Sequence, residues 1–148
     1  MLVWRYGVLA AVIAAVINAI IWLIARALGV SFRVQPPGQT ESTVNLLAVI
    51  LITIVPILLG VGVYVLLHRL TRRPFLVFLI IALVVFVIWL LPPLSAADET
   101  GTQVALILMH IVATLAVLAG VYRFEQQLSR LEYASRERNA RCERAAHR

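Results

Sequence analysis

Charged residues are scarce in this chain. Lysine is absent, and Asp, Glu, Lys and Arg together make up 14% of the 148 residues. Soluble domains usually carry about 25% charged and about 45–50% apolar residues. Here 62% of the residues are hydrophobic and the mean hydropathy is +0.97. The scarcity of charge therefore argues against an ordinary soluble domain and favours an integral membrane protein.

Cysteine is almost absent as well. The single Cys142 lies in a polar segment near the end of the chain. One cysteine cannot form an intramolecular disulfide, and it excludes a paired-thiol redox site. We also expect no metal ion or other cofactor, because no second histidine, cysteine or carboxylate accompanies the histidine of the apolar segments. A haem held by His68 and His110 is excluded by depth, since the two lie roughly 24 Å apart along the membrane normal.

Four long apolar runs contain no Asp, Glu, Lys or Arg. A helix needs about 20 apolar residues to cross the ~30 Å hydrocarbon core, and in lipid its backbone must be hydrogen-bonded within the segment. The sequence therefore predicts an all-α, antiparallel four-helix transmembrane bundle. The first run is longer than the apolar core of a cleaved signal peptide, so we expect it to remain as a membrane helix. Proton-coupled pumps and small multidrug exporters usually need a membrane carboxylate, and these runs contain none. We expect spans at about 6–25, 44–67, 75–91 and 104–121 in a bundle domain of residues 1–123.

The arginines indicate the orientation of the spans. Arg26 and Arg33 lie on one side of the predicted membrane, and the other eleven arginines lie on the opposite side. Such an excess marks the cytoplasmic side. We therefore expect a multi-pass protein of the bacterial inner membrane with both termini in the cytoplasm. The Pro36-Pro37-Gly38 stretch predicts a break in the first outer loop, and the acidic pair Asp98-Glu99 falls in the second.

Several short motifs carry a family resemblance. "WRYG" precedes the first run, "ARALGV" follows it, "LTRRP" joins the second and third runs, and "LMH" lies in the fourth. With these motifs the chain resembles a family of small four-helix membrane proteins of unknown function from actinobacteria and Chloroflexi-like bacteria, over residues 1–123. The resemblance implies four spans and no particular activity. Residues 124–148 are then an extension beyond the family core.

The polar residues of the spans form a candidate site. Counted from the outer ends of their runs, Asn18 and His110 lie about 12 Å deep and Thr53 about 13–14 Å deep. Thr114 lies one turn beyond His110 on the same helix face. We therefore predict a polar layer of Asn18, Thr53, His110 and Thr114 in the outer half of the bundle.

Three interpretations of this layer are open. Its members could hydrogen-bond to one another and fix helix register, as interhelical polar bonds do in membranes. They could instead line a pocket for a ligand or ion, because intramembrane ionisable residues often mark functional sites. His110 could also face lipid. Small residues at Gly7, Ala11 and Ala14 share a stripe with Asn18 and indicate that this asparagine points into the bundle.

The second run contains a candidate hinge. Pro56 leaves the carbonyl near Ile52 without its usual donor and loosens that turn. Gly60 and Gly62 follow within two turns and permit either bending or close packing. The alternative is a static kink, which membrane helices tolerate.

Residues 124–148 form a basic segment that we expect to continue the fourth helix into the cytoplasm. The spacing of Glu132 and Arg136, and of Glu137 and Arg141, allows stabilising ion pairs one helical turn apart. Aromatic residues are not interleaved with the arginines, so nucleic-acid binding is not predicted. Anionic lipid headgroups or a partner protein are the expected contacts. The candidate residues are Arg69, Arg72, Arg73, Arg130, Arg136, Arg138 and Arg141.

These features favour a non-catalytic integral membrane protein, either a homo-oligomer or an accessory subunit of a larger membrane complex. The alternative is a small transporter or channel that uses Asn18, Thr53 and His110. A membrane enzyme would need paired carboxylates or an activated nucleophile, and neither pattern is present in the spans.

Overall fold

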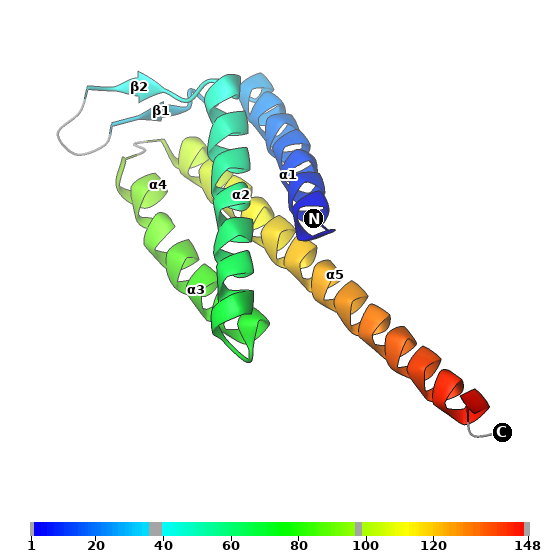
Figure 1. The fold of residues 1–148 in the computed structure, drawn as a ribbon. Coiled ribbons are helices and arrows are strands. Elements are labelled where there is room, and N and C mark those ends of the chain that lie inside the picture. Colours follow the sequence, from blue (N-terminus) through cyan, green and yellow to red (C-terminus); the bar gives the residue numbers. More distant parts are fainter. Residues whose placement is uncertain (1, 36–39, 97–98, 147–148) are drawn as a thin grey trace.

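The fold is almost entirely helical. The computed structural model describes residues 2–35, 40–96 and 99–146. The predicted loop break at Pro36-Pro37-Gly38, Asp98 and the last two residues of the tail lie outside these ranges. The helices are α1 (Leu2–Ala27), α2 (Leu46–Leu70), α3 (Pro74–Trp89), α4 (Leu91–Ala96) and α5 (Thr100–Ala146) (Figure 1). A two-stranded antiparallel ribbon, β1 (Arg33–Val34) and β2 (Ser42–Thr43), is a small departure from the all-α prediction.

Three helices, α1, α2 and α5, are long and apolar enough to cross a membrane. The third predicted span is a shorter apolar helix of 16 residues, α3. Asn45 begins α2 by accepting a hydrogen bond from the backbone N of Ala48 at 2.8 Å, as asparagine often does at a helix start. Pro74 begins α3, where a missing backbone N–H costs nothing. Part of the second outer loop forms α4, which the sequence did not predict.

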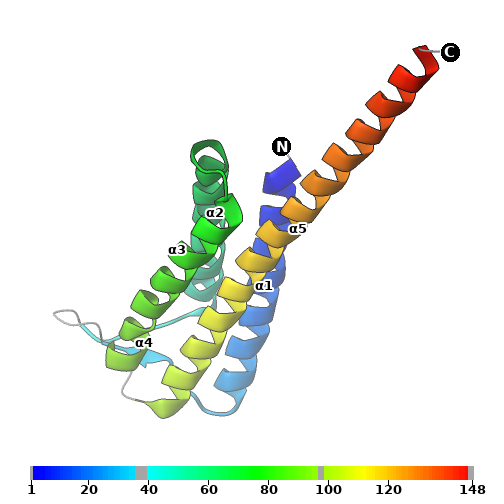
Figure 2. The same cartoon turned by 90° about the horizontal axis from the view of Figure 1, so that it is seen from below.

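The core lies where α1 packs between α2 and α5. Gly7 lies against Val61, and the Trp22 indole donates to the carbonyl oxygen of Val44 at 3.0 Å. The start of α1 thus meets the end of α2, so these two helices run in opposite directions. Figure 2 shows the same arrangement from below, with α1 and α5 side by side.

Small side chains let α1 and α5 approach closely. Ala11 and Ala14 are buried in the centre of the helices. A Cβ on Gly120 would lie 3.1 Å from the Cβ of Ala10 and 3.3 Å from the backbone oxygen of Tyr6. Such close approach is typical of packed helices in membranes, where small residues bring backbones together.

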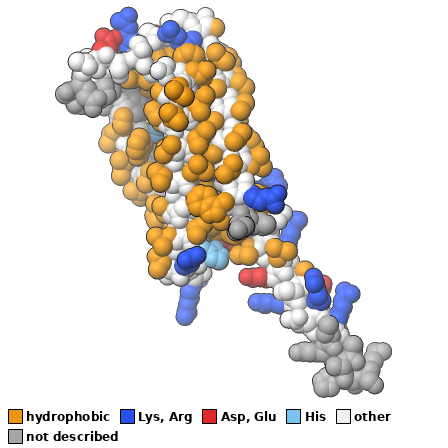
Figure 3. Space-filling view, turned by 45° about the horizontal axis from the view of Figure 1, so that its top comes forward, with side chains coloured by type: hydrophobic (Ala, Val, Ile, Leu, Met, Phe, Trp, Pro, Cys, Tyr) orange, Lys and Arg blue, Asp and Glu red, His pale blue; other side chains and the backbone are white. Residues whose placement is uncertain are grey.

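Most of the remaining apolar surface is exposed. Phe78 is the buried residue of α3, whereas large side chains such as Leu76, Ile80 and Val87 are more than half exposed. Hydrophobic side chains cover the face shown in Figure 3, and arginines lie at both ends of it. This distribution fits a helix that faces lipid or another subunit.

The longest element is α5, an unbroken helix of 47 residues. Its first half packs in the bundle and its second half projects beyond the other helices (Figure 1). The chain therefore continues as a helix through the part of the tail that the structure describes. The predicted ion pairs of Glu132 and Glu137 are not formed. Within residues 2–35, 40–96 and 99–146 the ion pair present joins Arg33 and Glu41 at 3.4 Å.

Candidate functional site

The polar layer is built around one asparagine. Asn18 Nδ2 donates to Thr53 Oγ1 at 2.9 Å and to the backbone oxygen of Met109 at 3.2 Å. The Thr53 hydroxyl in turn donates to the backbone oxygen of Val49 at 2.7 Å. Asn18 is 1% exposed and Thr53 is 4% exposed. One amide thereby joins α1, α2 and α5 at the depth that these residues share.

The remaining atom of that amide is unusual. Asn18 Oδ1 is buried and has no hydrogen-bond partner in the part of the chain that the structure describes. Both amide hydrogens are already donated, and the Thr53 hydroxyl hydrogen is used elsewhere. A buried acceptor without a donor costs about 1–3 kcal/mol. The oxygen is therefore a place where a water molecule or another donor would be stabilised.

His110 is not hydrogen-bonded to Asn18 or Thr53, whose bonds go to each other and to main-chain carbonyls. Its half-buried ring stacks on Trp89 of α3, with centroids 6.2 Å apart and planes 24° apart. Neighbouring residues on a helix differ in direction by about 100°. Because Met109 faces α1, His110 is turned toward α3. Thr114 is half buried and makes no hydrogen bond within the described residues. The layer is therefore Asn18, Thr53 and a carbonyl, rather than the four predicted side chains.

The candidate hinge lies in a continuous helix. Every residue from Leu46 to Leu70 is helical, so the chain stays in α2 across Pro56. A Cβ on Gly60 would make an ordinary contact with Val117 at 3.5 Å, whereas one on Gly62 would meet nothing within 4 Å. Neither glycine is thus required for close packing, and bending at Pro56 stays a prediction.

A carboxylate noted from the sequence only as a member of an acidic loop pair joins the loop after α1 to the start of α5. Glu99 Oε2 accepts hydrogen bonds from the Ser31 backbone N at 3.0 Å, the Ser31 hydroxyl at 2.6 Å and the Thr102 hydroxyl at 3.0 Å. These bonds, led by that of the Ser31 hydroxyl, lower the pKa of Glu99. The position of a glutamate just before α5 was the available signal, because helix starts favour negative charge.

A second unexpected contact lies at the opposite end of the bundle. The hydroxyl of Tyr64, which is fully buried, donates to Glu125 Oε1. The His68 ring lies edge-on to Tyr64 and Phe124, with centroid distances of 6.2 and 6.3 Å. Sequence spacing does not indicate this pair, because the partner glutamate lies 61 residues away.

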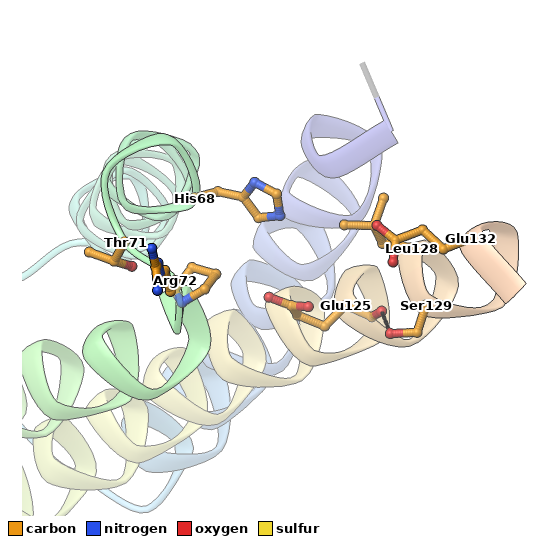
Figure 4. A pocket seen from close by; sticks show the side chains of 8 residues that line it. His68, Thr71, Arg72, Glu125, Leu128, Ser129 and Glu132 are labelled. Atoms are coloured by element: carbon orange, nitrogen blue, oxygen red, sulfur yellow. Dashed lines mark hydrogen bonds between the residues drawn. The ribbon is translucent and has the colours of Figure 1, made fainter.

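A cavity of about 260 Å³ opens beside this contact, between the end of α2 and the departing α5. Figure 4 shows His68 extending from α2 toward α5 and Glu125 extending back toward α2. A second cavity of about 130 Å³ lies on another side of His68 and has a mainly apolar lining that includes Tyr64 and Phe124. The larger cavity is lined by His68, Thr71, Arg72, Pro74, Glu125, Leu128, Ser129 and Glu132.

The candidate headgroup arginines fall into two sets. Those of the first set lie at the end of α2 and in the turn that follows it, and those of the second lie on the projecting half of α5. All of them are exposed, and Arg72 alone among them lines the larger cavity. The turn set is Arg69, Arg72 and Arg73, and the α5 set is Arg130, Arg136, Arg138 and Arg141.

The fold and its polar contacts define a small helical protein with three helices long and apolar enough to cross a membrane. Its described residues contain no group of three His, Cys, Asp or Glu side chains placed to hold a metal ion. The chain belongs to DUF6069, a family of unknown function whose model matches residues 2–127. No curated protein and no solved structure matches the chain. The distal part of α5 therefore lies beyond the family match.

Proposed function

We propose that the protein is a four-span, antiparallel bundle of the bacterial cytoplasmic membrane, with both termini in the cytoplasm. Three helices of sufficient length support this placement, as does the bias of arginine toward one side. α3 alone covers only about 24 Å. It is followed at Leu91 by α4, and the apolar residues of α4 extend its reach toward the outer surface.

Within that membrane the protein acts as a non-catalytic subunit, in a homo-oligomer or an assembly with other membrane proteins. The projecting half of α5 is the observation that carries this proposal. Leu131 and Tyr133 are exposed on the part of α5 that extends beyond the other helices (Figure 1), as are Arg136, Arg138 and Arg141. A helix that is polar on all sides needs ion pairs along its surface or a partner to remain ordered. The ion pairs expected along its described part are not formed, which favours a partner.

The natural cysteine provides a test of the orientation. A membrane-impermeant maleimide should label Cys142 only after cells are permeabilised, if the tail is cytoplasmic. In a Cys142→Ser background, Thr40→Cys should be labelled in intact cells, because residue 40 is exposed and precedes β2 at the other end of the bundle. Labelling of Cys142 in intact cells would contradict the proposed orientation.

The mass of the protein in polymer-extracted membrane discs tests the proposed assembly. We expect particles that contain more than one chain or additional subunits. Removal of the projecting helix after Gln127 should convert these particles to single chains without unfolding the bundle. Single chains from the complete protein would contradict the subunit proposal and leave the orientation result intact.

The turn arginines are the better candidates for anionic headgroups. Arg69, Arg72 and Arg73 lie at the end of an apolar helix, where headgroups would surround them. Arg136 lies about 20 Å further along α5 than Arg123. Charges separated by more than the Debye length of about 8 Å are largely screened. The distal arginines therefore suit a partner protein.

The transporter or channel alternative has one supporting observation, the buried Asn18 Oδ1 without a donor among the described residues. A permeating ion or polar solute could use this oxygen. Ion flux into vesicles that contain the purified protein, abolished by Asn18→Leu, would support the alternative. Equal flux with and without the protein would exclude it for the ions tested.

A further inference from the structure

Opposite charges face each other across the larger cavity without forming an ion pair. The cation is Arg72, which follows α2, and the carboxylates are those of Glu125 and Glu132 on α5. No ion pair within 4 Å joins these residues, and the guanidinium of Arg72 has no hydrogen-bond partner in the described segments. Glu125 accepts from Tyr64, and the side chain of Glu132 has no such partner in those segments. Two walls of opposite charge, separated by a cavity of about 260 Å³, suit a ligand that carries both charges.

The position of the cavity indicates what kind of ligand reaches it. His68 directly follows the predicted span 44–67, and Glu125 follows the predicted span 104–121 by one turn. If the chain spans the membrane as proposed above, the cavity lies at the level of the cytoplasmic headgroups. Pro74 belongs both to the lining and to α3. Exposed apolar side chains along α3 then provide a surface for acyl chains beside the polar cavity.

We propose that this cavity binds the headgroup of an amine-bearing zwitterionic phospholipid, phosphatidylethanolamine. The lipid phosphate contacts the guanidinium of Arg72, which can donate more than one hydrogen bond to phosphate oxygens. The primary ammonium donates to the carboxylates of Glu125 and Glu132. The hydroxyls of Thr71 and Ser129 line the same space and supply further polar contacts.

The same chemistry disfavours the other common headgroups. Phosphatidylglycerol carries no cation, so it would leave two carboxylates facing its phosphate. Phosphatidylcholine carries a quaternary ammonium, which has no N–H to donate. Quaternary ammonium groups are usually held by aromatic rings, and the described residues that line this cavity include no Phe, Tyr or Trp.

Competition among lipids tests the assignment. The full chain in detergent is given an equimolar mixture of phosphatidylethanolamine, phosphatidylglycerol and phosphatidylcholine, and bound lipid is counted by native mass spectrometry. We expect about fivefold more bound phosphatidylethanolamine than either competitor, a factor that corresponds to about 1 kcal/mol, the upper end for an exposed ion pair. Arg72→Gln and Glu132→Gln should each remove this preference.

Matched controls lie on α5 outside the cavity. Arg136→Gln and Glu137→Gln change charge on the exposed half of that helix and should leave the preference intact. Soluble glycerophosphoethanolamine serves as the second arm, because it carries the headgroup without acyl chains, and it should not displace the lipid.

Each remaining outcome overturns a distinct claim. If phosphatidylglycerol and phosphatidylethanolamine bind equally well, and only Arg72→Gln weakens their binding, the cavity is a site for anionic phosphate groups and not for a zwitterion. If glycerophosphoethanolamine displaces the bound lipid, the ligand of the cavity is a small soluble molecule and not a lipid. If none of the three phospholipids remains bound, this inference fails, and the labelling of Cys142 then shows whether the membrane placement fails with it.

Discussion

Asn18 is the residue at which α1 is joined to α2 and α5 by hydrogen bonds. Its carboxamide donates to a threonine hydroxyl on one side and to a main-chain carbonyl on the other. In lipid such bonds contribute modestly to stability, because the separated helices find other partners. Their greater effect is on register, since sliding α1 by one residue would turn Asn18 away from both acceptors.

A double-mutant cycle measures this bond directly. Asn18→Leu and Thr53→Val each remove one member of the pair while keeping similar volume. We expect a coupling energy of about 0.6 kcal/mol, and at most about 1.7 kcal/mol, from unfolding in increasing sodium dodecyl sulfate. The matched control pairs Asn18→Leu with Thr114→Val, because Thr114 makes no hydrogen bond among the described residues. Equal coupling in both cycles would contradict a specific Asn18–Thr53 bond.

Two glycines should respond to alanine with opposite signs. A Cβ at Gly120 would press on Ala10 and on the backbone of Tyr6, and overpacking of this kind costs typically about 1–3 kcal/mol. A Cβ at Gly62 would enter open space, where alanine stabilises a helix by about 0.5–1 kcal/mol relative to glycine. Thermal unfolding of Gly120→Ala and Gly62→Ala in the same detergent compares them. A stabilised Gly120→Ala variant would show that α1 and α5 are not in close contact.

At the scale of elements, the apolar runs and the depth of polar residues along them predicted features that lie within a single helix. The apolar runs correspond to three long helices and a shorter one, and the third run was placed within one residue of the start of α3. The shared depth of Asn18 and Thr53 predicts that they lie in one layer, and a hydrogen bond joins them there. Depth alone could not orient His110, because direction around a helix changes by about 100° per residue and a one-residue difference selects a different neighbour.

Contacts between distant segments were beyond such signals. The bond between Tyr64 and Glu125 and the set of donors around Glu99 both join segments more than 60 residues apart. Composition and spacing report each segment separately, so neither the pairing nor the cavity beside His68 could be read from them. Only the packing of α2 beside α5 shows that the charged residues of these two segments line one cavity.

The link between the outer loop and α5 should depend on pH through Glu99. Its folded-state pKa lies below its unfolded value. Its contribution to stability is therefore fully present above that unfolded value and is lost as pH falls through the lower folded-state value. Amide exchange at Ser31, corrected for intrinsic rate, should accelerate across this acidic window. In Glu99→Gln the acceleration should be absent, and pH dependence that survives the substitution would assign it to another group.

At the scale of the whole molecule, one helix serves two regions. The first half of α5 packs against α1 and closes the bundle, and the second half carries arginines away from it (Figures 1 and 2). Tyr64 and Glu125 are bonded where α5 leaves the other helices. The family match ends at residue 127, just beyond that contact. This coincidence supports separate roles for the bundle and the projecting helix, one in the membrane and one in contacts outside it.

Two truncations should separate these regions. A chain ending at Gln127 retains the bond between Tyr64 and Glu125, and we expect its unfolding free energy to stay within about 0.5 kcal/mol of the complete chain. A chain ending at Val121 leaves the buried Tyr64 hydroxyl without its acceptor, which should cost about 1–3 kcal/mol. Circular dichroism during thermal unfolding measures both, and Glu125→Ala in the complete chain isolates the hydrogen bond from the loss of Phe124. Equal stability of the two truncated chains would show that the contact does not hold α5 to the bundle, and a large loss in the longer one would place the projecting helix within the folded core.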